Sequence, residues 1–245
     1  MKTLYIFTSV NNIYTGQVAK IVKESKIDTK VINIEDLVEN ANKYKFEKED
    51  VAYFLCCNSL LIKDAIEILN QYGCTIINYD YLKCDYKKLD IQKLLQENDV
   101  LIPEICQTNN LDNLTFPLFC KENKHEGIIF QVYNKITLEK FFERFDIENF
   151  YFEEVIIAND SVGEEIKLYF VNGEIFGKKD SIIIDDALKT MCLNVSKALN
   201  DLEVFSVDII KTKENKSYVI DVNPSAGFYL SDQGRACFLN QIYNK

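Results

Sequence analysis

Short apolar runs alternate with segments of helical period at the start of the chain, and this alternation constrains the fold more than any other sequence feature. The runs at 3–10 and 29–34 flank VAKIVKES, whose apolar residues have helical spacing. A further run at 51–57 precedes IKDAIEILNQYG, in which Gly73 is well placed to end a helix, and the strand-like CTIIN follows. Strands separated by helices form parallel sheets, so we predict a small open α/β lobe over residues 1–80.

The pattern changes in the remainder of the chain, 81–245, which we treat as a second domain. The Lys-rich segment 83–98 has apolar residues on one side of a predicted helix. From residue 117 onward strand-like segments occur in pairs, and Asn172-Gly173 is typical of a type I′ turn between two of them. A helix around 185–202 precedes a last hairpin, VFSVDIIK and SYVIDVN. We therefore predict antiparallel sheet with helices packed on it.

Charge excludes one class of partner. The formal net charge is -10 and the pI is about 4.8, so a wide basic surface for nucleic-acid phosphates is not expected, although a local group of lysines is enough to hold one nucleotide. Arginine occurs only at Arg144 and Arg235, so planar guanidinium contacts to phosphate or carboxylate are restricted to two places. We predict no nucleic-acid partner, and charge stabilisation that depends on lysine and metal.

Cysteine and histidine usage argues against disulfides, zinc and cysteine nucleophiles. The eight cysteines are scattered, lie mostly in apolar runs and show no CxxC spacing, which favours reduced, buried thiols. His125 is the only histidine, so neither a zinc site nor a Cys-His pair is expected. The opening MKTLYIFTSV has too short an apolar stretch for a signal or a membrane span. We expect a cytoplasmic protein with no membrane partner.

The most informative stretch is the last hairpin, which carries three oxygen-bearing side chains. If the strands pair about the ENK turn, Asp208 lies opposite Asp221, and Asn223 shares the face of Asp221. Facing carboxylates repel unless a cation lies between them, and an all-oxygen set suits Mg²⁺. The hairpin is therefore a predicted metal site. The alternative is an exposed hairpin whose acidic side chains are only hydrated.

The same hairpin resembles the ATP-grasp superfamily, in particular the ribosomal-protein glutamate ligases and the ligases that tailor ribosomal peptides. FSVDII followed by YVIDVNPSAGF is similar to the family's metal-binding hairpin. Upstream, GCTIINYDYLKCDYKKLDIQKLL, FPLFCKE, YFEEVI and GEEIKLYFVNGEIFG resemble further family segments, and they occur in the family's order over about 180 residues, 50–235. The resemblance implies an ATP-grasp fold, with an N-terminal pre-grasp lobe and a pair of antiparallel-sheet lobes that clamp ATP.

The resemblance also implies the nucleotide contacts. Lys121 and Lys88, with Lys87 as a substitute for Lys88, would contact ATP phosphates, for which a compact ammonium charge is suited. Ordinary solvated lysines are the alternative. Glu153 or Glu154, together with Val155, would bracket the adenine and ribose, and otherwise they form the polar flank of a strand. Asp208, Asp221 and Asn223 would hold one or two Mg²⁺ ions that bridge the β- and γ-phosphates.

The implied reaction joins a carboxylate substrate to an amine substrate, possibly a peptide, through an acyl phosphate made with ATP. Such catalysis aligns reactants and neutralises charge, and so needs no protein nucleophile. Lys167 occupies the place of a family Arg that steadies the transferred phosphate. Arg235 is a candidate for holding a substrate carboxylate or the acyl phosphate, and a salt bridge to one of the chain's own acids is the alternative.

Two positions depart from the family pattern. The family's glycine-rich phosphate loop corresponds here to KENKHEGIIF, where Gly127 is the single glycine and Glu122 and Glu126 add negative charge. The second metal acid is Asp221 rather than the longer Glu. These departures leave two alternatives to a ligase: a degenerate ATP-grasp domain that binds nucleotide or a partner, and a small-molecule kinase on the same scaffold. A twofold homodimer is also consistent with a chain of this size.

Overall fold

A computed structural model describes residues 2–9, 15–55, 60–106, 115–124, 127–157, 165–179, 181–225 and 231–244. The chain forms two compact units, which are described one at a time below. The first comprises 1–85, 167–207 and 222–245, and the second comprises 86–166 and 208–221. The chain first passes from one unit to the other after Asp85, and the division into lobes at residue 80 stays a prediction.

The first unit contains the predicted parallel sheet. Its strand order is β2-β1-β3-β4, and every adjacent pair is parallel. The strands are β1 (Thr3–Thr8), β2 (Asp28–Asn33), β3 (Val51–Phe54) and β4 (Thr75–Ile76). In β3 all four residues are buried, which is the pattern of a strand covered on both faces. The alternation of apolar runs and helical segments therefore predicted this sheet correctly.

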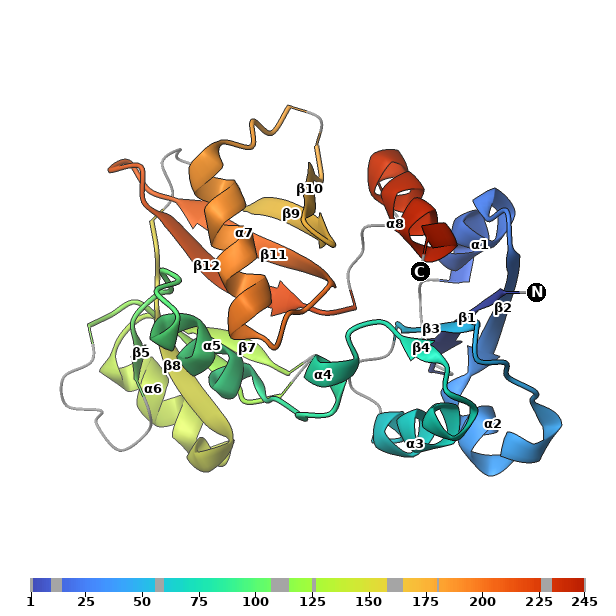
Figure 1. Cartoon of the computed structure of the whole chain (residues 1–245). Coiled ribbons are helices and arrows are strands. Elements are labelled where there is room, and N and C mark those ends of the chain that lie inside the picture. The colour runs from blue at the N-terminus through green and yellow to red at the C-terminus, as the bar shows by residue number, and fades with distance from the viewer. Residues whose placement is uncertain are drawn as a thin grey trace. The chain divides into compact units, whose positions relative to one another are not determined.

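Helices cover both faces of the parallel sheet (Figure 1). The helices are α1 (Thr15–Glu24), α2 (Ile34–Glu39), α3 (Ile62–Tyr72), α4 (Tyr79–Leu82) and α8 (Asp232–Asn244), with a 3₁₀ turn, η1, at Ala41–Lys43. Helix α3 ends where we predict, because Gly73 adopts a left-handed φ of 73° and its N–H bonds to Asn70 O at 3.1 Å. Helix α8 was not predicted.

Helix α8 returns from the end of the chain to the core of the first unit. Phe238 packs on Tyr53 of β3 with ring centroids 5.0 Å apart. Leu4 and Ile6 of β1 belong to the same buried cluster, together with Val18 and Ile21 of α1 and Leu239 and Ile242 of α8. The apolar residues of α8 therefore complete one face of the parallel sheet.

The second sheet has the order β10-β9-β11-β12. Its strands are β9 (Ile166–Val171), β10 (Glu174–Gly177), β11 (Val204–Lys211) and β12 (Ser217–Asn223), and α7 (Asp186–Ala198) precedes β11. Strands β9 and β10 are antiparallel, and φ is positive at both Asn172 (51°) and Gly173 (93°). These angles confirm the predicted type I′ turn. Strands β11 and β12 each pass from one unit into the other.

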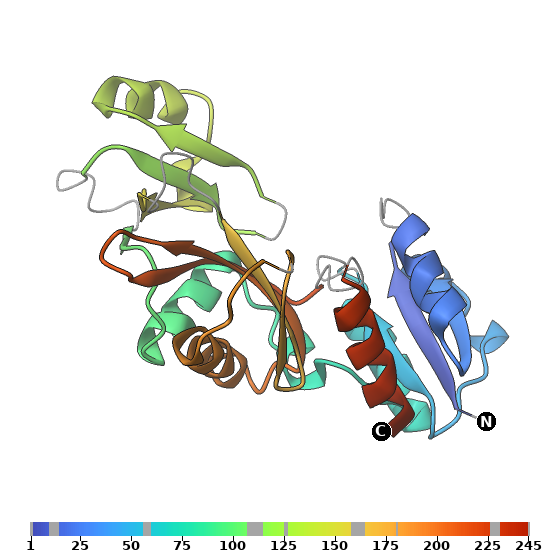
Figure 2. The same cartoon turned by 90° about the horizontal axis from the view of Figure 1, so that it is seen from above.

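The third sheet lies in the second unit and is antiparallel, with the order β5-β8-β6-β7. Its strands are β5 (Ile105–Cys106), β6 (Leu118–Glu122), β7 (Ile129–Val132) and β8 (Phe150–Glu154). Helices α5 (Lys88–Glu97) and α6 (Lys135–Phe142) and the 3₁₀ turn η3 (Ile147–Asn149) accompany them. Figures 1 and 2 show α6 along one face of this sheet, where Leu138 and Phe141 pack on Cys120 and Phe152.

The prediction of buried thiols holds only in part: among the described cysteines Cys120 and Cys192 are buried, Cys74, Cys106 and Cys237 are half-buried, and Cys84 is exposed. The six cysteines in the described ranges are free, and burial raises the pKa of Cys120 and of Cys192 to about 12. Cys56 and Cys57 lie outside those ranges. Of the helices described, none combines the length and the apolar character that a membrane span requires.

Asn78 joins distant parts of the first unit. It is 5% exposed and has a left-handed φ of 62°, which Asn tolerates better than most residues. Its amide nitrogen donates to Val204 O at 2.7 Å and to Pro224 O at 3.3 Å. Its amide oxygen accepts from Glu203 N at 3.0 Å and from Val204 N at 2.9 Å. One side chain therefore connects the end of the parallel sheet to the start of β11 and to the end of the last hairpin.

We expect Asn78→Ala to lower the free energy of unfolding by about 3 kcal/mol, because it leaves buried backbone groups without partners. Asn78→Asp keeps the acceptor but turns a carboxylate oxygen toward the carbonyl of Val204, so it should also destabilise. Urea denaturation measures both losses. Asn70→Ala is the control, since Asn70 makes an exposed bond to Tyr79 Oη at 3.2 Å. Equal, small effects at both positions would contradict the structural role of Asn78.

Candidate functional site

The third sheet separates an apolar face from a charged face. In the pairing of β6 with β8, Lys121 lies opposite Tyr151, and Phe119 lies opposite Glu153. Because side chains alternate along a strand, these residues share one face, while Cys120 and Phe152 point into the core under α6. Lys121 and Glu153 are therefore brought to the same face by strand register.

Lys121 and Glu153 form a buried ion pair on that face. Lys121 is 7% exposed and Glu153 is 2% exposed, and Lys121 Nζ lies 2.5 Å from Glu153 Oε1. Lys121 Nζ also donates to the carbonyl of Ile220 in β12 at 3.2 Å. Burial raises the pKa of Glu153, and Lys121 opposes this rise. Lys121 is thus not an ordinary solvated lysine.

The two carboxylate oxygens of Glu153 differ in their hydrogen bonding. Its second oxygen, Oε2, is buried and meets no donor within the described part of the chain. A buried acceptor without a hydrogen bond costs free energy, so such groups commonly mark a place where a ligand or water donates. Tyr151, its neighbour on this face, is 1% exposed, and its pKa is raised by burial and then by Glu153 and Asp221.

Lys88 and Asp221 form a second ion pair in the same unit. Lys88 is the first residue of α5, and its Nζ lies 3.2 Å from Asp221 Oδ1. The Lys88 side chain is 15% exposed, whereas the neighbouring Lys87 is exposed to solvent. The start of α5 is held by Asn123, whose Oδ1 accepts from Leu89 N at 2.9 Å. Of the two lysines proposed for this position, the structure therefore brings Lys88 to the charged face.

The two pairs interact, and we call Lys88, Lys121, Glu153 and Asp221 the charge cluster. The pKa of Glu153 responds to Asp221, which raises it, and to Lys88, which lowers it. Two ammonium groups and two carboxylates balance each other, so Lys121 and Glu153 are buried beside no excess charge, while the Asp221 side chain is 39% exposed. An ammonium pair beside a helix N-terminus also suits a bound phosphate, because both attract negative charge.

The predicted metal ligands lie on the last two strands. Asp208 of β11 is half-buried, and Asn223 ends β12 with its Oδ1 accepting from Ser225 N at 2.9 Å. Of the apolar residues that alternate with these ligands, Val207, Ile209 and Val222 are buried and Ile220 is half-buried. Among described residues no group of three or more His, Cys, Asp and Glu side chains could hold a metal. The donors are all hard oxygens and fit Mg²⁺ completed by other oxygens, so this site stays a prediction.

The other predicted nucleotide contacts lie at the end of β8. Glu154 is exposed, as alternation with the buried Glu153 requires, and its N–H donates to Glu104 O at 2.9 Å. Val155 follows the strand and is half-buried. Only Glu153 joins the charge cluster, and the roles of Glu154 and Val155 stay predictions.

The two predicted catalytic cations both lie in the first unit. Lys167 of β9 is half-buried, and its carbonyl accepts from Lys178 N at 2.9 Å. Arg235 of α8 is 3% exposed and makes a bidentate pair with Glu24, at 2.9 and 2.8 Å, and a bond to Asp232 at 2.6 Å. The Glu24 carboxylate raises the pKa of Arg235. Arg235 therefore binds the chain's own carboxylates, and a catalytic role for it stays a prediction.

The predicted phosphate loop is described only in part. His125 and Glu126 lie outside the described residues. Glu122 Oε1 pairs with Lys124 Nζ at 2.6 Å, and its Oε2 accepts from Ile128 N at 3.0 Å, contacts that lower the pKa of Glu122. A Cβ at Gly127 would lie 2.9 Å from Glu122 Cβ and from Lys124 O, so glycine is required for this close turn.

Sequence reasoning missed two polar groups that shape the charged face. Asn123, which holds the start of α5, follows β6 in a segment that we interpreted only as a phosphate loop. The carbonyl of Ile220, which accepts from Lys121, is a backbone group. An Asn directly after a strand is a signal for a local cap, but nothing in the sequence points to a bond with Leu89, 34 residues earlier.

Comparison with known sequences gives no relative. No protein-family model matches the chain, and a search of curated proteins finds no match either.

Solved structures, by contrast, match over nearly the whole chain. A RimK-domain ATP-grasp protein from Sphaerobacter thermophilus has a TM-score of 0.70 and 11% identity over 98% of this chain and 99% of that one. The ATP-grasp ligase PsnB with a minimal precursor has a TM-score of 0.73 and 12% identity over 98% of both chains. D-alanine–D-alanine ligase from Bacillus anthracis with ATP has a TM-score of 0.69 and 18% identity over 98% and 95%. The chain has the ATP-grasp fold, which confirms the prediction from the sequence resemblance.

Proposed function

We propose that this protein is an ATP-dependent carboxylate–amine ligase that forms an amide through an acyl phosphate. Its substrates would be a carboxylate and an amine, borne by a peptide, a protein or an amino acid. The observation that carries the proposal is the charge cluster, in which Lys121 and Glu153 on one face of a sheet adjoin Lys88 of α5 and Asp221 of β12, in an ATP-grasp fold. A cytoplasmic location and a twofold homodimer are parts of this proposal.

The molecules bound in similar solved structures support the choice of ligands. The D-alanine–D-alanine ligase structure contains ATP, and a PsnB structure contains a minimal precursor, Mg and ADP. These proteins are ligases of amino-acid or peptide substrates by name. The shared fold makes Mg-ATP and a carboxylate–amine substrate pair the proposal that best accommodates the charge cluster.

Each member of the charge cluster has a role in the proposal. Lys88 and Lys121 would neutralise phosphate oxygens, since an ammonium group offers three donors and can keep one carboxylate contact. Glu153 Oε2 would accept from the amino group of adenine, which would supply its missing donor. Glu154 and Val155 would bracket the base and ribose from the end of β8.

Mg²⁺ would be held by Asp208, Asp221 and Asn223. Bound there, the ion would neutralise charge on the β- and γ-phosphates. For Asp221 to serve, its carboxylate would share or release Lys88 Nζ, which now lies 3.2 Å away. Lys88 would then be free to contact a phosphate. Separation of this one ion pair would therefore make Asp221 available to Mg²⁺ and Lys88 available to ATP.

The chemistry needs positioned charge rather than a protein nucleophile. A carboxylate oxygen of the substrate attacks the γ-phosphorus. The bond between that phosphorus and the oxygen that leaves with ADP breaks, and an acyl phosphate forms. The amine then attacks the acyl carbon, phosphate leaves, and the amine loses a proton. Lys121 and Lys88 would stabilise the developing charge on the phosphates, with Lys167 as a further proposed contact to the transferred group. Arg235 would serve the acyl phosphate only if it exchanged Glu24 for that ligand.

Two other functions are compatible with the same fold. A nucleotide- or partner-binding module is favoured by the loop after β6, in which Gly127 is the single glycine. A kinase would transfer the phosphoryl group to a hydroxyl and stop. Product analysis separates the three: ADP with an amide indicates a ligase, ADP with a phosphate ester indicates a kinase, and nucleotide binding without ADP indicates a module.

We expect Mg-ATP to raise the melting temperature of the wild-type protein, because ligands that bind only the folded state stabilise it. The rise should require Mg²⁺ and should be lost in Asp208→Asn/Asp221→Asn, which removes two ionic oxygens. Thermal shift with ATP, with and without EDTA, measures this. If no nucleotide raises the melting temperature, the proposal that the protein binds ATP is wrong.

The neighbouring lysines at the start of α5 provide a matched comparison. Lys88→Ala should weaken ATP binding by about tenfold or more, since a charge-assisted hydrogen bond contributes about 1.5–3 kcal/mol. Lys87→Ala removes the same charge one residue away, from an exposed side chain, and should change the affinity little. Titration calorimetry gives both dissociation constants. Equal losses of affinity in the two variants would show that the effect comes from overall charge and not from a contact of Lys88 with ATP.

The pair on β6 and β8 allows stability to be separated from nucleotide binding. Lys121→Met should cost about 3–5 kcal/mol, because it leaves the buried Glu153 carboxylate without its partner. Lys121→Met/Glu153→Gln should recover most of that stability and still fail to bind ATP. Urea unfolding and calorimetry on the same samples test this. As a control, Lys63→Met breaks the exposed pair with Asp85 and should have little effect on either measurement. Normal ATP binding by the double variant would exclude Lys121 and Glu153 from the site.

A further inference from the structure

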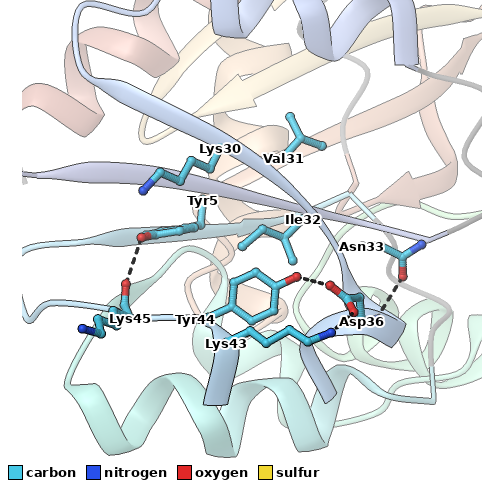
Figure 3. Close-up of a pocket in the computed structure, with 9 residues that line it drawn as sticks. All are labelled: Tyr5, Lys30, Val31, Ile32, Asn33, Asp36, Lys43, Tyr44 and Lys45. Atoms are coloured by element: carbon cyan, nitrogen blue, oxygen red, sulfur yellow. Dashed lines mark hydrogen bonds and ion pairs between the residues drawn. The ribbon is translucent and has the colours of Figure 1, made fainter. Parts of the chain in front are cut away.

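A hollow of about 630 Å³ lies at the edge of the parallel sheet in the first unit (Figure 3). Its lining includes Tyr5 of β1, Lys30 and Ile32 of β2, and the segment 43–45 after η1. The volume falls within the range of sites that bind ligands. No step of the proposed ligase reaction uses it.

Strand register and two hydrogen bonds fix the walls of the hollow. Tyr5 pairs with Lys30, so their side chains share one face of the sheet, and Ile32 shares that face by alternation. Tyr5 Oη donates to the carbonyl of Lys45 at 3.2 Å, which ties the segment 43–45 to the sheet. On the far side Tyr44 Oη donates to the carboxylate of Asp36, as Figure 3 shows.

The hollow is positively charged in an acidic protein. Lys30, Lys43 and Lys45 line it against the single carboxylate of Asp36, whereas the chain as a whole has a net charge of -10. Lys43 Nζ is 3.9 Å from Asp36 Oδ1, a long contact at the exposed rim. Lys30 lies over the Tyr5 ring, 5.5 Å from its centroid, and contacts Asp28 at 3.3 Å. Three lysines with apolar side chains beneath them suit a ligand with negative charge and some apolar surface.

Strand β2 also leaves one backbone edge open to an additional strand. Within the described chain it is the outermost strand of its sheet and pairs only with β1. An open edge is a template for another extended chain, and charged side chains along it determine which chains can add. Lysines beside this edge repel basic segments and attract acidic ones.

We propose that the β2 edge and the adjoining hollow bind an acidic polypeptide segment in an extended conformation. Backbone groups of the segment pair with β2, and alternate acidic side chains reach Lys30, Lys43 and Lys45. The apolar side chains between them lie on the opposite face of the sheet, beside Val31, which is 48% exposed. This site recognises its partner without ATP and so does not depend on the ligase reaction.

The test uses the full chain and a short fluorescent peptide that alternates glutamate with valine, with a glutamine–valine peptide for comparison. Fluorescence anisotropy without nucleotide should show binding of the glutamate peptide alone, weakened by salt. Lys43→Ser/Lys45→Ser should weaken it about tenfold. Lys20→Ser/Lys23→Ser removes the same charge from exposed positions on α1 and should leave it unchanged. Lys30→Ser provides an independent variant of the same hollow if the double variant unfolds.

Three results would overturn the proposal. No binding of the glutamate peptide would show that the proposed site does not exist. Equal binding by the two double variants would show only nonspecific electrostatic attraction. Competition by free glutamate at the peptide's own concentration would show a small-anion site instead. Each result leaves the ligase proposal intact, because no arm contains ATP.

Discussion

The buried pair of Lys121 and Glu153 is the interaction on which the candidate site depends. Transferring two charges from water into a protein interior is costly, and the cost is recovered only with close geometry and further hydrogen bonds. Here strand register provides the geometry, since Lys121 and Glu153 lie on one face of β6 and β8, while the other face packs under α6. The carbonyl of Ile220 adds a further acceptor for the ammonium group. The same alternation that builds the apolar core therefore also builds the charged face.

Balanced charge explains how this face can be both stable and ready for a ligand. Lys88 and Asp221 repeat the arrangement of Lys121 and Glu153, so the cluster has no net charge. Mg-ATP brings anionic and cationic groups together, and each would find an opposite partner in the cluster. Exchange of partners then costs less than the burial of a new, uncompensated charge would. Glu153 Oε2, which meets no donor in the described part of the chain, would still lack one after such an exchange of ion pairs.

The sequence predicted local structure and faces well, and distant partners poorly. Period and turn chemistry located the parallel strands, the end of α3 at Gly73 and the turn at Asn172-Gly173, because these depend on nearby residues. Lys121, Lys88, Glu153 and Asp221 were chosen by resemblance, but their pairing could not be predicted, since Lys88 and Asp221 are 133 residues apart. The role of Asn78 depends likewise on a strand 126 residues away. Helix α8 was missed because its apolar residues are buried by contacts with distant strands of the parallel sheet, which the local sequence does not reveal.

The scarcity of arginine shapes how this chain can handle anions. Of the two arginines, Arg235 is buried and makes a bidentate pair with Glu24, and Arg144 is exposed at the end of α6. The Arg235 guanidinium is thus committed to structure, and apart from Arg144 the cations that can meet phosphate or carboxylate ligands are lysines. An ammonium group has no preferred plane, so its direction is set by the groups that hold it. Glu153 and Asp221 therefore do more than balance charge: they orient Lys121 and Lys88, as a guanidinium's own geometry would otherwise do.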